Sequence, residues 1–524
     1  MKTPPKKEKI HFASVLLGAI LLAAGPLPGI AEEAEVPPAG KESDAGSGQI
    51  HEAPEVVTTR HSIMLNGETI AYTARTGKLA LKDREGETTA EIFFIAYTRD
   101  ATDPSERPIT FSFNGGPGSS SVWMHMGLLG PRRVLLDKDG FALPPPHQLA
   151  ENPWSLLDVS DLVFIDPVST GFSRPADFEK EKEFHGLEED VGSVGDFIRR
   201  YVTEFERWSS PKFLIGESYG TTRAAALSLH LQDRYGMYLN GIMLVSSVLD
   251  FSSIRYSEDN DLPYVLFLPS MAATARYHDR LSGAFQKRPL RDFLDEVKAF
   301  AAGPYREALF QGDNLPGEAM RSVAGSLSAY TGIAADDFLE YRLRLDAFSF
   351  FEMLLKKEGK RIGRFDGRYT GIAPLPWESW ETGKNYDPSY SQIYGAYSSA
   401  FNDYVRRTLE YESDLPYEIL ANVRPWNFGE EFTGRYVNVS QRLREALIMN
   451  PHLRIQVCAG YYDLATPCFA AEYTFNRMLL HPQLRGNITF TYYEAGHMMY
   501  TVEKELARQK EALAAFIKSA VPEK

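Results

Sequence analysis

Cysteine is scarce in this chain of 524 residues, which contains only Cys458 and Cys468. Two cysteines are too few for a disulfide framework, and they lack the multi-cysteine spacing of a structural zinc site. They could pair with each other across a short loop or remain two buried thiols, and the sequence leaves both alternatives open.

Sequence motifs for metal and nucleotide cofactors are also missing. The chain has no H-E-x-x-H, no P-loop and no G-x-G-x-x-G, and its 11 histidines are scattered along it. We therefore expect a function that needs no metal ion and no nucleotide cofactor.

Positive charge is in deficit, with 56 Lys and Arg against 70 Asp and Glu and a formal net charge of −14. The first 31 residues contribute +3 (four Lys minus Glu8), so the rest of the chain carries −17. A surface of this sign repels phosphate backbones and anionic lipids. Nucleic acids and membrane surfaces are therefore not expected as partners.

Long hydrophobic runs are confined to the first 31 residues, where lysines precede an uncharged apolar stretch that ends in small residues. This order is typical of a secretory signal peptide. An uncleaved anchor is less favoured, because glycines and prolines leave an apolar core shorter than the ~20 residues that a spanning helix needs. We expect a signal peptide at 1–31, a disordered linker at 32–54, and an exported protein that is periplasmic or secreted and free of the membrane.

The rest of the chain has the pattern of an α/β protein. Alternating apolar and polar residues at 61–81 and 87–100 predict antiparallel strands, and later short apolar runs predict strands buried on both faces. Helical stretches at 190–205, 221–235 and 504–520 lie between or after these runs. The alternation predicts a sheet with helices on both faces.

This alternation stops between residues 251 and 434, where the sequence is mostly helical. We expect a catalytic core formed by 55–250 and 435–524, with 251–434 inserted as a mainly helical cap. Six tyrosines of this segment could line a substrate cleft or form the packing face of its helices, and packing is favoured for most of them. They are Tyr386, Tyr390, Tyr394, Tyr397, Tyr404 and Tyr411.

Ser218 is the candidate nucleophile. It is the centre of Gly216-Glu217-Ser218-Tyr219-Gly220, directly after an apolar strand and directly before a helix-forming run. A G-x-S-x-G turn in this setting lifts the hydroxyl clear of the sheet, and small flanking residues let strand and helix approach closely. Because the five-residue pattern recurs by chance in loops, the position between strand and helix carries the prediction.

A serine nucleophile needs a base, and the base needs an acid that orients it. Asp463 and His497 each follow a predicted strand, so both would reach the edge of the sheet at which Ser218 lies. Asp250 ends another apolar run and is the rival acid. Taken alone, Asp463 would be explained better as a turn former and His497 as a buried structural histidine.

The stretch Asn114–Ser120 (NGGPGSS) closely resembles the serine carboxypeptidase family. Further similarities to this family occur in order along both parts of the predicted core: Asn152-Pro153-Trp154-Ser155, Val163–Ser173, Glu217–Gly220, Gly460 with Asp463 and Pro467, and Gly496–Met498. The resemblance implies an α/β-hydrolase fold and hydrolysis of C-terminal peptide bonds through an acyl-enzyme, with peptide or protein C termini as substrates.

The resemblance also implies the roles of eight residues. The catalytic triad would comprise Ser218 as nucleophile, His497 as base and Asp463 as orienting acid. The oxyanion hole would consist of the backbone N–H groups of Gly116 and Tyr219. The terminal carboxylate of the substrate would be bound by Asn114, Gly115 and Glu217.

The sequence departs from the family pattern near these residues. Leu128 stands where the family has a second Glu, Ser119 where it has Cys, and Thr221 where it has Gly. In the family pattern two carboxyl groups of the protein face the substrate carboxylate, and they bind it best at low pH, where they hold protons. Because one of the two is missing here, we predict weaker selection for a free C terminus and a less acidic pH optimum. Arg132 or Arg133 could compensate for the missing Glu.

Two other functions are compatible with these residues. An acyltransferase or esterase would use the same triad on a non-peptide ester, and only the acceptor that reaches the acyl-enzyme would separate it from a peptidase. A non-catalytic binding protein on the same scaffold is the third alternative, and the retention of all three triad positions argues against it.

We predict cleavage of the chain near Ala31, because Gly29-Ile30-Ala31 offers small residues at the two positions that signal peptidase tests. N-terminal sequencing of the exported protein should therefore begin near Glu32. A sequence that begins at Met1 would instead indicate a retained anchor.

Overall fold

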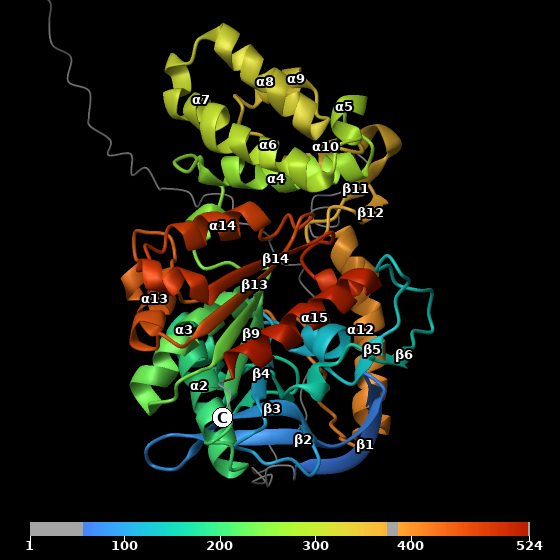
Figure 1. The fold of residues 1–524 in the computed structure, drawn as a ribbon, viewed down its shortest axis with the longest axis vertical. Helices are drawn as coiled ribbons and strands as arrows, with labels where there is room; N and C mark the ends of the chain where they lie inside the picture. The colour runs from blue at the N-terminus through green and yellow to red at the C-terminus, as the bar shows by residue number, and fades with distance from the viewer. Residues whose placement is uncertain (1–55, 375–385, 522–524) are drawn as a thin grey trace, which may run out of the picture. The chain divides into compact units, whose positions relative to one another are not determined.

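The protein is described here by a computed structural model that covers residues 56–374 and 386–521. The predicted signal peptide and linker lie outside the described residues. Figure 1 shows a central sheet with helices on both of its faces.

The central sheet comprises ten strands within the described residues, in the order β1-β2-β3-β7-β4-β9-β10-β13-β14, with β8 paired to β3. The strands are β1 (Val57–Leu65), β2 (Glu68–Lys82), β3 (Thr88–Arg99), β4 (Ile109–Phe113), β7 (Asp161–Ile165), β8 (Arg174–Pro175), β9 (Lys212–Glu217), β10 (Gly241–Val245), β13 (Arg454–Gly460) and β14 (Ile488–Tyr493). The first three are antiparallel, as predicted, and β7 through β14 in this order are parallel. The carboxyl ends of six strands therefore meet at one edge.

Each face of the parallel strands is covered by its own set of helices. In β9, Leu214 belongs to one hydrophobic core, whereas Phe213 and Ile215 belong to the other. The first core includes α2 (Leu187–Glu204), α3 (Tyr219–Tyr235) and α13 (Ser440–Met449), and the second includes α1 (Val122–Met124), α12 (Pro388–Arg407) and α15 (Glu503–Ala520). Such double burial explains the continuous apolar runs of the strands. The α/β-hydrolase fold is confirmed by this arrangement.

A third hydrophobic core is built mainly from the helices between β10 and β13. These are α4 (Leu262–Tyr277), α5 (Gly283–Gln286), α6 (Leu290–Phe300), α7 (Arg306–Gln311), α8 (Gly317–Thr331), α9 (Ala335–Glu340) and α10 (Ala347–Met353), and they are followed by the hairpin of β11 (Lys360–Ile362) and β12 (Thr370–Ile372). This core also takes in Tyr462 and Leu464, which follow β13, and α4 packs on α14 (Cys468–Asn476). The domain boundaries given above stay a prediction.

Helix α12 belongs to the core of the sheet rather than to this third core. Its Tyr397 and Tyr404, together with Tyr411, are buried there, whereas Tyr394 is exposed. The three buried tyrosines are therefore packing residues. They pack in the hydrophobic core that covers one face of the central sheet.

Shorter elements complete the described chain. A small sheet pairs β5 (Arg132–Val134) with β6 (Leu149–Glu151). Single 3-10 and π turns are η1 (His125–Leu129), η2 (Leu156–Asp158), η3 (Phe178–Phe184), η4 (Phe251–Ser253), η5 (Ala301–Tyr305), η6 (Gly312–Asn314), η7 (Lys356–Glu358), η8 (Glu430–Phe432), η9 (Pro482–Asn487) and η10 (Met499–Thr501).

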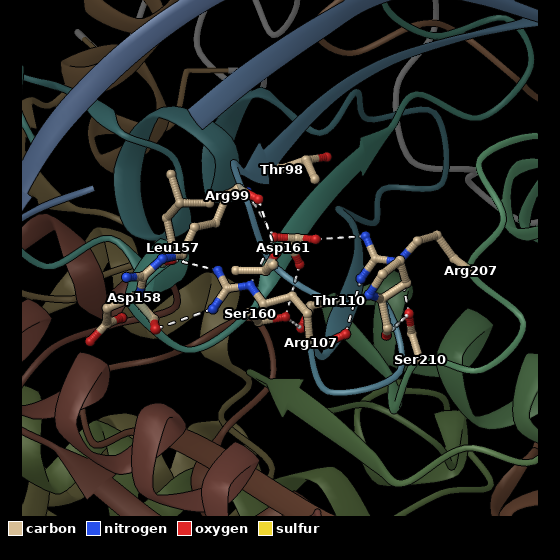
Figure 2. Close-up of polar contacts among 12 residues, drawn as sticks. Thr98, Arg99, Arg107, Thr110, Leu157, Asp158, Ser160, Asp161, Arg207 and Ser210 are labelled. Carbon is tan, nitrogen blue, oxygen red and sulfur yellow. Dashed lines mark hydrogen bonds and ion pairs between the residues drawn. The ribbon is translucent and has the colours of Figure 1, made fainter. Parts of the chain in front are cut away.

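A buried ion-pair cluster joins segments at the amino ends of the parallel strands (Figure 2). Asp161, the first residue of β7, accepts hydrogen bonds from Arg107 Nε at 2.9 Å and from Arg207 Nη1 at 2.6 Å. Arg207 also donates to the carbonyl of Arg107 and to Ser210 Oγ. Removal of one partner from a buried pair typically costs about 3–5 kcal/mol, because a charge is left unpaired. This cluster lies at the sheet edge opposite to Ser218.

Cys458 and Cys468 are both buried and unpaired in the structure, so of the two alternatives it has two free thiols. Burial raises the pKa of Cys458 to about 11 and that of Cys468 to about 12. Neither is therefore a reactive thiolate at neutral pH. Among the helices of the described residues, none has the length and apolarity required to cross a bilayer.

Candidate active site

Ser218 occupies the sharp turn between β9 and α3. Its φ of 60° and ψ of −129° are unusual for a residue other than glycine, and such strain is common where a side chain must be presented for function. The Ser218 N–H donates to the carbonyl of Val245 on β10, which ties the turn to the sheet. Ser218 is partly exposed, whereas Glu217 and Tyr219 on either side are buried.

His497 and Asp463 are hydrogen-bonded to each other. The distance between His497 Nδ1 and Asp463 Oδ2 is 2.8 Å, and both side chains are buried. Burial lowers the pKa of His497, but the charge and hydrogen bond of Asp463 outweigh it, with help from Glu217, and the net shift is upward. A carboxylate in this position holds the imidazole in one tautomer and stabilises its protonated form.

The carboxylate of Asp463 is fully engaged. Asp463 Oδ1 accepts hydrogen bonds from the backbone N–H groups of Ala465 and Thr466 at 2.8 and 2.9 Å, and Oδ2 accepts from Thr466 Oγ1 at 2.8 Å. Ser246 Oγ donates to the carbonyl of His497 at 2.6 Å, and Thr466 Oγ1 lies 3.1 Å from the carbonyl oxygen of Ser246. A network of short hydrogen bonds therefore fixes the acid and the backbone of the base.

The glycine loop after β4 lies directly against the nucleophile turn. A side chain on Gly115 would collide with the backbone nitrogen of Tyr219, and the chain bends at Gly116 with a φ of +103°, which favours glycine. The carbonyl of Asn114 accepts a 2.6 Å hydrogen bond from Arg223, which is itself paired with Asp190. The loop and the backbone of Tyr219 are therefore in close contact, and their role as an oxyanion hole stays a prediction.

Asn114 and Glu217 form a buried polar pair. Asn114 Nδ2 donates to Glu217 Oε1 at 2.8 Å, while the other oxygen, Oε2, has no hydrogen-bond partner among the described residues. Burial raises the pKa of Glu217 to about 7, although the positive charge of His497 and the nearby Tyr500 and Asn114 groups oppose the shift. Tyr500 faces this carboxyl group without reaching hydrogen-bonding geometry. Glu217 is therefore a carboxyl group that can carry a proton near neutral pH.

The departures from the family pattern are accommodated locally. Leu128 is fully buried in the core beside the sheet, and Thr221 Oγ1 donates to the carbonyl of Ser218 at 2.7 Å. Arg132 lies 3.6 Å from Glu151, and Arg133 pairs with Glu503 while stacking on a tryptophan ring. Both arginines are engaged in these pairs.

The structure joins Asp463 to His497 and Asn114 to Glu217 by hydrogen bonds, and it gives the rival Asp250 other partners. Among the described residues, no hydrogen bond joins the Ser218 hydroxyl to His497. Asp250 caps η4 by accepting hydrogen bonds from the N–H and hydroxyl groups of Ser252, away from His497. Sequence reasoning missed Ser246 and Thr466. The Asp-x-x-Thr spacing at 463–466 was an available signal for Thr466, because such a hydroxyl commonly bonds a carboxylate three residues before it. Nothing local pointed to Ser246.

Among the described residues, no group of three or more His, Cys, Asp or Glu side chains is arranged to hold a metal ion.

Residues 70–272 match the family model described as serine carboxypeptidase. Over these residues the chain is similar to the serine carboxypeptidases. The matched residues include the glycine loop and the nucleophile turn, and they end before Asp463 and His497. The catalytic roles of all these side chains stay predictions.

Individual relatives of the carboxypeptidase type match parts of the chain. Serine carboxypeptidase-like 5 and 3 from Arabidopsis thaliana are each 29% identical, over 26% and 42% of this chain and 30% and 46% of their own lengths. The pheromone-processing carboxypeptidase of Saccharomyces cerevisiae is 32% identical over 26% of this chain and 19% of its own. The chain thus spans less than half the length of these curated relatives.

Solved structures were also compared. A proline iminopeptidase from Mycobacterium smegmatis aligns with 85% of this chain and 98% of its own, at 12% identity and a TM-score of 0.35. The fold assignment follows from the strand order of the chain itself rather than from that likeness.

The choice of acid can be tested with two matched substitutions. We predict that Asp463→Asn lowers the turnover rate by about 10⁴-fold, because the amide would favour the wrong tautomer of His497. Asp250→Asn should leave turnover within about twofold of the parent, because the Asp250 carboxylate accepts its hydrogen bonds from Ser252 in the turn η4 rather than from His497. Turnover of an activated ester by both purified variants provides the measurement, and the opposite ranking would overturn the assignment.

Proposed function

We propose that this protein is an exported serine-type carboxypeptidase, which removes residues from peptide C termini through an acyl-enzyme intermediate. The observation that carries the proposal is the buried Asp463–His497 hydrogen bond, which lies at the same sheet edge as the Ser218 turn. Export is included because of the signal-like pattern of residues 1–31.

Acylation would begin with attack of Ser218 Oγ on the scissile carbonyl carbon. The hydroxyl proton would pass to His497, whose imidazolium Asp463 would stabilise, and the carbonyl oxygen would become an oxyanion. The N–H groups of Gly116 and Tyr219 would donate hydrogen bonds to it, and one such donor is typically worth about 2.7–4 kcal/mol of barrier. His497 would then return the proton to the amine of the departing residue as the C–N bond breaks.

Deacylation would repeat these steps with water. His497 would take a proton from water as its oxygen attacks the acyl carbon, and it would give that proton to Ser218 Oγ as the ester bond breaks. The products are the shortened peptide and a free amino acid. An acyltransferase would differ only in the nucleophile that replaces water at this step.

Recognition of the free C terminus would depend on Asn114 and Glu217. Glu217 Oε2 is buried without a partner among the described residues, so a protonated Glu217 has a donor available for an incoming carboxylate. Asn114 can offer an amide N–H at any pH. A peptide amide has no charge to receive these hydrogen bonds, so it should bind more weakly.

The nucleophile can be tested with a serine-directed fluorophosphonate. We predict stoichiometric labelling of Ser218, no labelling of Ser218→Ala, and a loss of turnover of about 10⁴-fold or more in that variant, because only binding and the oxyanion hole would remain. Mass spectrometry of the labelled peptide identifies the modified residue. Stoichiometric labelling at another serine would refute the assignment.

The pKa of Glu217 predicts how selection for a free C terminus depends on pH. Since burial raises this pKa to about 7, Glu217 is mostly protonated and able to donate below that pH, and mostly ionised and repulsive above it. We predict that the ratio of kcat/KM for a peptide to that for its C-terminal amide falls at least tenfold between pH 5 and pH 9, since a hydrogen bond to a charged group is worth about 1.5–3 kcal/mol.

Glu217→Gln is the matched control, because its amide keeps a donor at every pH. The ratio in this variant should be nearly independent of pH, and protonation of His497 cancels from it because it affects both substrates. Equal cleavage of peptide and amide at every pH would contradict the carboxypeptidase proposal and favour an esterase or an endopeptidase.

A further inference from the structure

A turn that follows the helices of the third core lies against both the acid and the base. This turn, residues 364–368, connects β11 to β12. The carbonyl of Phe365 accepts a 2.6 Å hydrogen bond from the backbone N–H of His497, and the carbonyl of Arg364 accepts one of 3.1 Å from Leu464. On the other side, the N–H of Gly367 donates to the carbonyl of Tyr462 at 3.0 Å. The backbone on both sides of Asp463 and at His497 is therefore bound to this turn.

The side chain of Asp366 makes the contact next to the base. Asp366 Oδ2 accepts a 2.9 Å hydrogen bond from the backbone N–H of Gly496, the residue before His497. Gly496 leaves no room for a side chain, since an added Cβ would collide with Asp366 and lie 2.5 Å from the carbonyl oxygen of Phe365. The close approach of the turn therefore requires glycine at this position.

Arg368 compensates the buried charge of Asp366. Its Nε and Nη2 donate to the two oxygens of Asp366 at 2.9 and 2.5 Å, and both side chains are less than a tenth exposed. The Arg368 guanidinium lies 5.3 Å from the ring centre of Tyr462. A buried carboxylate without such a partner would be costly, so the pair allows Asp366 to stay ionised beside Gly496.

The 364–368 turn is held in place by other parts of the inserted segment. Ile362 of β11 is part of the third hydrophobic core, and the N–H of Phe365 donates to Ser389 Oγ on α12 at 3.0 Å. The ring of Phe365 lies 5.1 Å from that of His497. The position of His497 therefore depends on β11 and α12, which are not part of the central sheet.

We propose that Asp366 is a positioning residue for the base. By binding Gly496, and with Arg368 as its partner, it sets the position of His497 relative to Asp463 and Ser218. The inference rests on the proposed role of His497 as a base, and it is independent of whether the substrate is a peptide or an ester. Displacement of a catalytic group by about 1 Å can lower a rate by about 10²-fold. Loss of the contacts of Asp366 could therefore slow the reaction measurably by letting His497 shift.

The test compares rates of Ser218 labelling by a fluorophosphonate in purified, folded variants. Asp366→Ala should label about 10²-fold more slowly than the parent, because the loop of His497 loses its contact. Asp366→Asn keeps an oxygen that can accept from Gly496 and should recover at least tenfold of that loss. Gly496→Ala, which pushes the turn away, should slow labelling as Asp366→Ala does.

Asp161→Ala is the matched control, because Asp161 is an equally buried aspartate paired with arginines at the opposite edge of the sheet (Figure 2). Thermal unfolding should show that it lowers stability as Asp366→Ala does, while it labels within about twofold of the parent. Labelling of Asp366→Ala at the parental rate, or an equal slowing in both variants, would overturn the positioning role.

The same experiment separates this inference from the proposed function. With a peptide substrate, Asp366→Ala should lower kcat and leave KM within about twofold, because Asn114 and Glu217 are untouched. If the parent is labelled but cleaves no peptide, the carboxypeptidase proposal fails while the positioning role stands. If the parent is not labelled, both fail.

Discussion

The hydrogen-bond ladder of the parallel strands continues past their carboxyl ends, and the site depends on this continuation. The N–H of Ser218 bonds the carbonyl of Val245, and the N–H of Ser246 bonds that of Cys458, each one residue beyond its strand. The N–H of Tyr462 likewise bonds the carbonyl of Ala495. Loops that are far apart in the sequence therefore keep the spacing of adjacent strands. The side chains on these loops are held at correspondingly fixed distances from one another.

Buried carboxylates in this protein fall into two groups. Asp161, Asp366 and Asp463 each accept several hydrogen bonds, so burial leaves them satisfied. Glu217 is buried as deeply, but one of its oxygens has no partner within the described residues, and its pKa rises to about 7. Asp166 Oδ2 is also buried without a partner within the described residues, and burial raises the pKa of Asp166 to about 6. Glu217 differs from Asp166 in its position, because it lies next to the nucleophile.

The helical segment between β10 and β13 contributes to the site by packing as well as by hydrogen bonds. Tyr462 and Leu464, which flank Asp463, belong to the hydrophobic core of that segment. The acid loop is thus held on one side by the hydrogen bond from Tyr462 to Ala495 and on the other by the hydrophobic core of the helical segment. A loop held on two sides moves less than a loop held on one, because local opening of the loop would have to break both sets of contacts.

The sequence by itself determined the strands, the helices that cover them, the turn at Ser218 and the places of Asp463 and His497 after strands, because each follows from short-range apolar patterns and from the order in which strands end. Only the tertiary structure decided the partners of these residues. Ser246 and Asp366 bind backbone groups of distant loops, and a single hydrogen bond between such loops leaves no periodicity in the sequence. The same holds for Glu217, whose neighbours are visible in the motif but whose pKa is set by burial.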